Sequence, residues 1–222
     1  MFRNYIKIAW RNIAKSKTFS FINVLGLALG MTSSLLILLW VQDERSINQF
    51  HEKGSRIYQV LENQQWTGND ISTTTATPGP LATALKAEIP EIERTVKMTW
   101  EEEKLLAVGD KSYKEKGRYA SVDLFQIFSF PLVHGKPETA LASPNAIVLS
   151  ETAAKKFFGK TDVVGRSIRV DNQEDHQITA VVKDVPETSS LQFDYVLPEE
   201  TFEKNNDWLT KWDNNGIRTF VL

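Results

Sequence analysis

Acidic side chains are the first residues here that could bind a metal ion or transfer a proton. Glu101, Glu102 and Glu103 could share a cation, but neighbouring residues of a strand point to opposite faces, which would split the ligands. We therefore expect a solvated acidic surface. Asp184 and Asp194 could be proposed as an acid–base pair. The sequence indicates no catalytic partner for either residue, and both are typical of turns and strand ends.

The histidines and the glycine–lysine motif do not complete any known catalytic or metal-binding pattern. His51, His134 and His176 are isolated, and no second histidine lies four residues after His51, as a zinc-protease helix requires. Gly159 precedes Lys160 and Thr161 as at the end of a phosphate loop, but the loop's first glycine is replaced by Ala154. Cysteine is absent, which excludes thiol catalysis and cysteine-ligated metals. We expect no catalytic residue, no metal site and no cofactor.

Tryptophan rings could also build a ligand site, because they combine a large apolar surface with a hydrogen-bond donor. Packing in a core or an interface is the commoner role of such rings, and both interpretations stay open. The residues concerned are Trp66, Trp100, Trp208 and Trp212.

Charge is distributed unevenly over the elements that must position these side chains. The chain has 222 residues, with 26 Lys and Arg against 28 Asp and Glu. Its first 18 residues hold five cations and no acid, which leaves 21 basic against 28 acidic residues after them. An acidic main part argues against nucleic acid as a partner. The five cations are Arg3, Lys7, Arg11, Lys15 and Lys17.

An uncharged stretch, residues 18–42, predicts a helix that spans a membrane. At about 1.5 Å per residue it would be roughly 37 Å long, and the hydrocarbon core of a bilayer needs about 30 Å. It is longer than the apolar part of a secretory signal, and it lacks the polar stripe of a buried core helix. We place the transmembrane helix at residues 19–41, with the lipid bilayer as its direct partner.

The basic flank predicts the orientation of this helix, since basic flanks stay in the cytosol. Residues 1–18 would then be cytosolic and residues 43–222 periplasmic. Within the first segment, Ile6, Trp10 and Ile13 recur at helical spacing between the cations, which predicts an amphipathic helix in the headgroup layer. This helix could be an elbow that contacts a cytosolic partner or only a basic flank, and the spacing favours neither.

Two pairs of residues in this region are candidates for specific contacts in the membrane. Trp10 and Trp40 are expected at the membrane interface, together with the five cations. Gly26 and Gly30 form a pattern of small residues that lets two helices approach closely. Because this pattern is common by chance in apolar segments, we treat the two glycines only as helix-packing candidates.

Apolar periodicity, turn residues and caps predict a mixed α/β exterior domain. We expect helices at residues 81–89, 123–128 and 151–158, the last capped by Ser150 and ended by Gly159. Residues 43–55 should continue the membrane helix, and residues 66–80 should form a loop. The apolar, strand-like end predicts that the chain continues beyond Leu222. Strands are expected at 56–65, 95–100, 104–108, 111–119, 146–149, 166–170, 177–183, 193–197 and 218–222.

Several short motifs occur in an order that is more specific than any one of them. In the N-terminal part they occupy residues 5–13, 21–27, 43–44, 48–51 and 56–58. In the exterior part they occupy residues 120–130, 131–132, 135–137, 140–141, 147–151, 154–159, 164–165 and 182–186. Their order and spacing resemble those of MacB/FtsX-type ABC transporter permeases, and the resemblance covers nearly the whole chain.

This resemblance implies an α+β fold. An N-terminal amphipathic helix and one transmembrane helix would precede a mixed α/β periplasmic domain, built from a porter-like βαβ lobe and a smaller inserted β-rich lobe. The implied boundaries are 1–18 for the cytosolic elbow helix and 19–41 for the transmembrane helix. Residues 42–222 would form an incomplete MacB-like periplasmic core domain, with the inserted lobe at about 145–190.

The resemblance also implies the role of a permease subunit in the bacterial inner membrane, which is not itself an enzyme. Such permeases usually have four spans and work as dimers with a cytosolic ABC ATPase. They relay ATP-driven motion to the periplasmic domain, in some cases toward a periplasmic or outer-membrane partner, to export or extract a substrate. This chain departs from the pattern, because it lacks spans two to four and any ATPase. The substrate and the direction of transport do not follow from the sequence.

Two other classes of protein remain open. One span followed by a mixed α/β exterior domain also suits a membrane-anchored sensor or receptor. A receptor should show one further span and a signalling module after residue 222, whereas a permease should show a block of three spans. A tethered exterior enzyme is weakened by the lack of a nucleophile or a metal-binding set.

Overall fold

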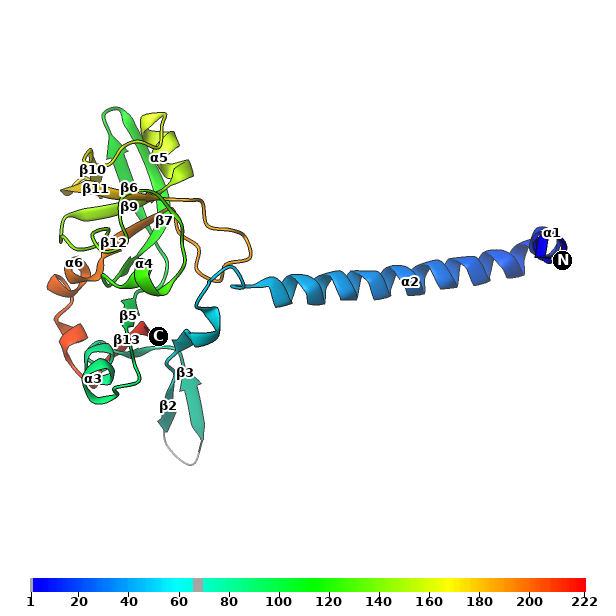
Figure 1. The fold of residues 1–222 in the computed structure, drawn as a ribbon, viewed down its shortest axis with the longest axis horizontal. Helices are drawn as coiled ribbons and strands as arrows, with labels where there is room; N and C mark the ends of the chain where they lie inside the picture. Colours follow the sequence, from blue (N-terminus) through cyan, green and yellow to red (C-terminus); the bar gives the residue numbers. More distant parts are fainter. Residues whose placement is uncertain (1, 66–69) are drawn as a thin grey trace. The chain divides into compact units, whose positions relative to one another are not determined.

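The computed structural model describes residues 2–65 and 70–222 and divides the chain into two compact units. The first unit ends at Ile47 and consists of two helices. The second unit, Asn48–Leu222, contains all of the described strands (Figure 1).

The helices of the first unit are α1 (Phe2–Lys15) and α2 (Lys17–Ser46), separated only by Ser16. The break is small, since the Ser16 N–H still donates to the carbonyl of Asn12 at 3.1 Å. With 30 residues and no proline, α2 extends over roughly 45 Å, so it contains the predicted span and continues past it. It ends at Ser46, and the expected helix is wrong beyond that residue: turns and the 3-10 helix η1 (Gly54–Arg56) follow.

The strands of the second unit form a mixed 11-stranded sheet and a separate two-stranded hairpin. The sheet runs β1-β13-β5-β7-β12-β9-β11-β10-β6, with β4 on β13 and β8 on β11, and the hairpin pairs β2 with β3. The strands are β1 (Tyr58–Gln59), β2 (Glu62–Gln65), β3 (Ile71–Thr74), β4 (Thr77–Pro78), β5 (Thr95–Met98), β6 (Glu102–Val108), β7 (Lys111–Ala120), β8 (Leu132–His134), β9 (Ala146–Ser150), β10 (Ser167–Val170), β11 (Glu174–Val182), β12 (Tyr195–Pro198) and β13 (Asn215–Val221).

Six of these strands close into a barrel. Strand β6 pairs with both β7 and β10, which joins the ends of the path β7-β12-β9-β11-β10-β6. The pairs β7–β12 and β9–β11 are parallel, and the other four are antiparallel. Alternate side chains fill the interior, and helix α5 (Glu151–Phe158) adds Phe157 to it. Fully buried residues of this core are Leu106, Ile147, Leu149, Ile168, Ile178 and Leu197.

A second apolar core surrounds strands β5 and β13 and helix α4 (Leu124–Ile127). Phenylalanine rings dominate it: Phe130 lies 5.1 Å from Phe193, and Phe128 lies 5.3 Å from Phe220, measured between ring centroids. Each buried phenylalanine stabilises the fold by about 1.5–3 kcal/mol. The remaining helices of this unit are α3 (Leu81–Glu88), α6 (Glu199–Lys204) and the 3-10 helix η2 (Asp207–Thr210).

The structure confirms the predicted mixed α/β fold class and several of its elements. Helices α3 and α5 lie where the sequence predicts them, and strands β10 and β11 overlap the ranges expected at 166–170 and 177–183. The Ser150 hydroxyl accepts from the Ala153 N–H at 3.1 Å, and Gly159 ends α5 with φ of 75°, as their cap positions require.

Two predictions, the strand at residues 56–65 and the loop at residues 66–80, are wrong. The expected strand 56–65 is two strands, because the chain leaves one sheet for another at Val60 and Leu61: β1 pairs with β13, and β2 pairs with β3. The expected loop 66–80 is wrong for its described part, which contains β3 and β4. Strand β3 is rich in β-branched residues, a signal the loop prediction passed over. Strand β8 has only three residues and is formed by its pairing with β11.

The lobe boundaries stay a prediction. The structure divides the described chain only after Ile47. The barrel strands extend from Glu102 to Pro198, which is on both sides of the range 145–190 expected for the smaller lobe.

Candidate functional site: the apolar helix and the segment after it

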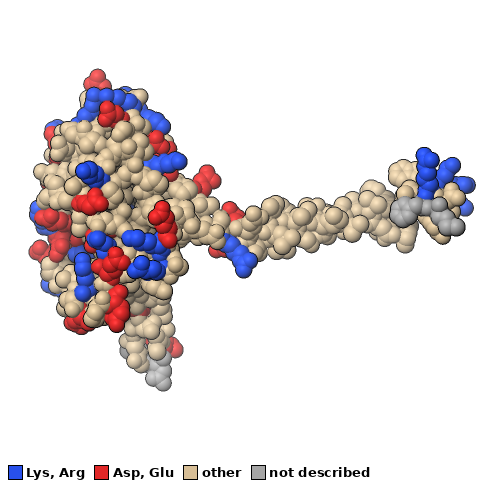
Figure 2. All heavy atoms as spheres, viewed as in Figure 1, with Lys and Arg blue, Asp and Glu red and all other residues tan. Residues whose placement is uncertain are grey.

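Helix α2 presents an apolar surface that no other part of the described chain covers. None of its residues is buried, and Leu38 and Trp40 are 64% and 65% exposed. Figure 2 shows the middle of this helix free of charged side chains. It is the one helix of the described residues that is long and apolar enough to cross a membrane. Because hydrocarbon is the solvent that such a surface prefers, α2 is the candidate membrane-spanning element.

Helix α1 carries the cations predicted to lie at the membrane surface. Arg3, Lys7, Arg11 and Lys15 follow one another at four-residue spacing, and Lys17 begins α2. Basic side chains gather at this end of the unit in Figure 2. Trp10 is 72% exposed and is therefore available to a headgroup layer. The interface roles of these residues and of Trp40 stay predictions.

Gly26 and Gly30 lie in a shallow groove on α2. A Cβ atom built at either glycine would meet nothing within 4 Å. The other residues that line the groove are Leu27, Met31, Ser34 and Leu35. The Ser34 hydroxyl donates to the carbonyl of Gly30 at 2.9 Å, so it is satisfied within the helix. The groove can accept another helix, but helix packing there stays a prediction.

The acidic candidates are held in structural contacts. Glu101 pairs with Lys116 at 3.3 Å, while Glu102 lies 3.9 Å from Lys104, so the two acids contact different lysines. Burial raises the pKa of Glu102, although Lys104 opposes the shift. Among the described residues, no three His, Asp or Glu side chains are placed to hold a metal ion.

Asp184 and Asp194 both accept hydrogen bonds from backbone N–H groups. Asp184 accepts from the N–H and the hydroxyl of Thr152, both at 2.8 Å, in the first turn of α5. Asp194 accepts from the Lys116 N–H at 3.3 Å. These contacts agree with the expectation of turn and strand-end residues.

The tryptophans differ in their surroundings. Trp208 packs against Phe202 and donates from its indole N–H to Asn206 at 2.9 Å. Trp100 and Trp212 are exposed, and Trp66 lies outside the described residues. Trp208 therefore has a packing role.

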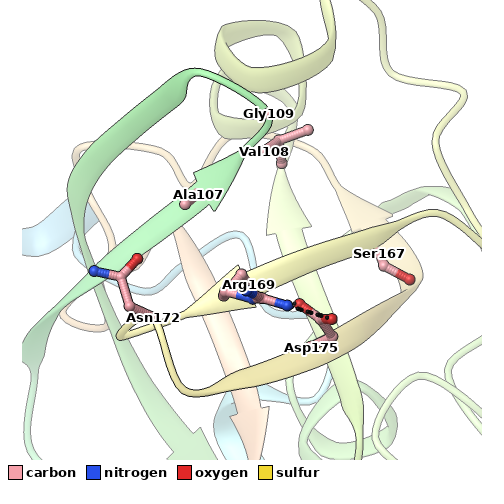
Figure 3. Close-up of a pocket in the computed structure, with 7 residues that line it drawn as sticks. All are labelled: Ala107, Val108, Gly109, Ser167, Arg169, Asn172 and Asp175. Carbon is pink, nitrogen blue, oxygen red and sulfur yellow. Dashed lines mark hydrogen bonds and ion pairs between the residues drawn. The ribbon is translucent and has the colours of Figure 1, made fainter.

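A polar pocket that the sequence did not indicate lies beside strands β6, β10 and β11 (Figure 3). Arg169 and Asp175 cross it with two hydrogen bonds of 2.8 and 2.9 Å. This contact raises the pKa of Arg169 and lowers that of Asp175. The charged groups of the pocket thus already satisfy each other. Its other lining residues are Ala107, Val108, Gly109, Ser167 and Asn172.

Residues 48–53 are the first residues of the second unit and are bonded to other parts of it; we call them the junction segment. Asn48 has a left-handed backbone with φ of 61°. Its N–H donates to the carbonyl of Thr188 at 2.8 Å. Its side-chain amide donates to the Ser190 hydroxyl and accepts from the Ser190 N–H, both at 2.9 Å.

His51 fixes the other end of the junction segment. The residue is 6% exposed, and its Nδ1 accepts from the Ser129 N–H at 3.1 Å. Phe50, Phe128 and Phe130 surround the ring, with centroids 4.0 to 5.2 Å away. Burial lowers the pKa of His51, which favours the neutral ring that this hydrogen bond requires. The sequence showed residues 48–51 only as a motif, because the side-chain partners of Asn48 and His51 are 142 and 78 residues away.

Comparison with known proteins relates the chain to a protein family. The family profile described as the MacB-like periplasmic core domain matches residues 20–221. A domain of a protein assigned as a permease from Porphyromonas gingivalis is 25% identical, with a TM-score of 0.63 and coverage of 75% of this chain and 74% of its own. No curated protein matches the chain significantly.

Two further solved structures share the fold at lower identity. The periplasmic region of MacB from Actinobacillus actinomycetemcomitans is 17% identical, with a TM-score of 0.54 and coverage of 80% of this chain and 76% of its own. The extracellular domain of the noncanonic ABC-type transporter YknZ from Gram-positive bacteria is 14% identical, with a TM-score of 0.51 and coverage of 75% and 81%.

Proposed function

The chain belongs to the MacB-like periplasmic core domain family, and on this basis we propose that it is the permease subunit of an ABC transporter in a bacterial inner membrane. The observation that carries the proposal is the combination, in one chain, of this domain with a helix whose whole apolar surface is exposed. A cytosolic ABC ATPase would be a separate subunit or domain, so that this chain supplies no catalytic residue.

In this proposal α2 crosses the inner membrane with its N-terminal end in the cytosol. The five cations of residues 1–18 support that orientation, because basic flanks are retained on the cytosolic side. The exterior unit would then lie in the periplasm. Trp10, Trp40 and the cations would hold α1 and the ends of the span at the two interfaces.

The proposed mechanism is mechanical. ATP-driven closure of the ATPase would move the membrane helices, and α2 would carry this motion to the periplasmic domain, which acts on an exported or extracted substrate. The groove at Gly26 and Gly30 would receive a helix of a permease dimer partner. A further periplasmic or outer-membrane partner would contact the exterior unit.

Affinity purification of the full-length protein from its native membrane tests the proposal. We expect an ABC ATPase to copurify and its ATP hydrolysis to depend on the permease. Recovery with a signalling protein and without an ATPase would contradict the proposal and favour a membrane-anchored sensor. Recovery without any ATPase, together with no ATP-linked transport, would also contradict it.

A further inference from the structure

The junction segment is bonded to two separate parts of the exterior unit. Asn48 reaches the loop between β11 and β12, at Thr188 and Ser190. Three residues further on, His51 and Glu52 reach Ser129, whose N–H donates to the His51 ring and whose hydroxyl accepts from the Glu52 N–H at 3.0 Å. The chain that leaves α2 is therefore held at two sites within four residues.

The left-handed backbone of Asn48 lets the role of its side chain be separated from that of its backbone. A left-handed φ favours glycine on steric grounds, and asparagine is the side chain that tolerates it best. Glycine would fit the backbone, but it would lose both contacts to Ser190. The side chain of Asn48 is thus a tie to the β11–β12 loop.

That loop continues the path into the barrel. The Gln192 side chain donates to the carbonyls of Pro186 and Ser189 at 2.8 and 2.9 Å, which braces the loop internally. The Gln192 carbonyl accepts from Arg118 Nη2 at 2.8 Å. Arg118 lies on β7 and is 4% exposed, so the path ends at a buried barrel residue.

The His51 end of the segment is rigid for a different reason. Its ring is packed among phenylalanines of the second apolar core, and Lys53 Nζ adds a hydrogen bond to the Gln126 carbonyl at 3.1 Å. Burial in an aromatic cluster restricts rotation, because close-packed cores resist displacement.

We propose that Asn48 and His51 are positioning residues: they clamp the first segment of the exterior domain, so that motion of α2 enters the domain at the β11–β12 loop and at Ser129. The clamp follows from the contacts above, whereas the source of the motion rests on the proposed function. Coupling between distant sites needs direct measurement, and both parts can be measured separately.

The test uses the full chain, copurified with its ATPase and reconstituted in lipid nanodiscs. Hydrogen exchange is followed in the segments that contain Asn48 and Ser190, without nucleotide and with ATP and vanadate. Three variants are compared with the wild type. Asn48→Gly keeps the backbone conformation and removes the tie. Asn48→Asp restores it, because the Ser190 hydroxyl can donate to a carboxylate. Asn172→Gly is the matched control, since Asn172 is also left-handed, with φ of 57°, in the β10–β11 turn.

Without nucleotide, we expect exchange around Ser190 to be roughly tenfold faster or more in Asn48→Gly and unchanged in the other two variants. With ATP and vanadate, the wild type, Asn48→Asp and Asn172→Gly should show altered protection in the β11–β12 loop, and Asn48→Gly should lose this response. The melting temperature of Asn48→Gly should stay within a few degrees of that of the wild type, which separates uncoupling from unfolding.

Three outcomes would overturn the inference. Unchanged exchange at Ser190 in Asn48→Gly would show that the side chain is not a tie. Faster exchange with an intact nucleotide response would show a structural contact without a coupling role. A wild-type complex that hydrolyses ATP without any change of exchange in the β11–β12 loop would contradict the coupling role. The measurement without nucleotide would still test whether Asn48 is a clamp. If no ATPase copurifies, the proposed function fails by itself.

Discussion

Burial favours the neutral form of His51, and we expect this histidine to make the exterior unit less stable in acid. Its pKa is lowered from the ordinary value of 6.5, so the unfolded chain takes up a proton first as the pH falls. The stability that the neutral ring contributes is therefore complete above about pH 6.5 and declines below it. His176 shifts in the same direction through burial, whereas the raised pKa values of Glu102 and Glu199 act in the opposite sense.

The pH dependence of a His51 variant separates these contributions. In His51→Asn, the amide oxygen can replace Nδ1 as acceptor for the Ser129 N–H, and nothing at this site titrates. We expect a lower overall stability but a smaller loss of stability between pH 7.5 and pH 5 than in the wild type. Urea unfolding of the exterior unit at several pH values measures this. Equal losses in both proteins would contradict the assignment.

Lys97 and Glu199 form a buried ion pair that joins β5 to α6. Their charged groups lie 2.6 Å apart, and the side chains are 15% and 7% exposed. We expect Lys97→Ala to destabilise the unit by about 3–5 kcal/mol, because it leaves a carboxylate buried without its partner. The double variant Lys97→Met with Glu199→Leu should recover most of this loss.

A matched control lies on the same helix. Lys204 and Glu200 form an exposed pair on α6, 3.5 Å apart with 60% exposure of each side chain. Lys204→Ala should change the free energy of unfolding by under about 0.5 kcal/mol. Urea unfolding measures all three variants. A Lys97→Ala effect as small as that of Lys204→Ala would show that water enters the buried site.

For the secondary-structure elements, two glycines test how much close packing between strands stabilises the barrel. Gly117 on β7 is opposite Tyr195 on β12, and a Cβ atom there would lie 2.4 Å from the Tyr195 carbonyl oxygen. Gly117→Ala must therefore push the two strands apart, and we expect a loss of about 1–3 kcal/mol or more. Gly159 has open space around it, so Gly159→Ala should cost only about 1 kcal/mol for its left-handed backbone.

Thermal unfolding of the two alanine variants decides between these causes. The barrel interpretation requires the larger loss in Gly117→Ala and faster hydrogen exchange in β12. Equal losses would mean that the strands adapt to the added methyl group.

Local signals predicted the elements that are determined locally. Ser150 and Gly159 mark both ends of α5, and β10 and β11 overlap the strands expected at 166–170 and 177–183. The division of residues 56–65 could not be predicted, because it depends on β13, more than 150 residues away. The same holds for His51: its hydrogen-bond partner Ser129 is 78 residues away.

For the whole molecule, membrane topology is the prediction that most others depend on. The chain has no cysteine, so single cysteines can report accessibility without background. Ser112 is exposed on β7, and Ser16 precedes α2. In cells with a permeable outer membrane, we expect Ser112→Cys to react with a membrane-impermeant maleimide and Ser16→Cys to be protected until the cells are lysed. The reverse pattern would contradict the proposed orientation.

Composition alone was enough to predict α2, because an uncharged segment of this length has few alternatives. The family likewise followed from the order of motifs, and the match over residues 20–221 confirms it. The barrel did not follow, since ring closure depends on the pairing of β6 with β10, whose register includes only Leu106 and Ala107 on β6. Such a short pairing leaves no pattern in the sequence.

Ring closure also limits how another protein could attach to this domain. Where the six barrel strands are paired on both sides, they offer no free backbone edge for strand addition, whereas residues 111–116 of β7 pair only with β6. A partner chain that binds along the doubly paired part of the barrel wall must therefore recognise side chains. Its affinity would be altered by surface substitutions that leave every strand in place.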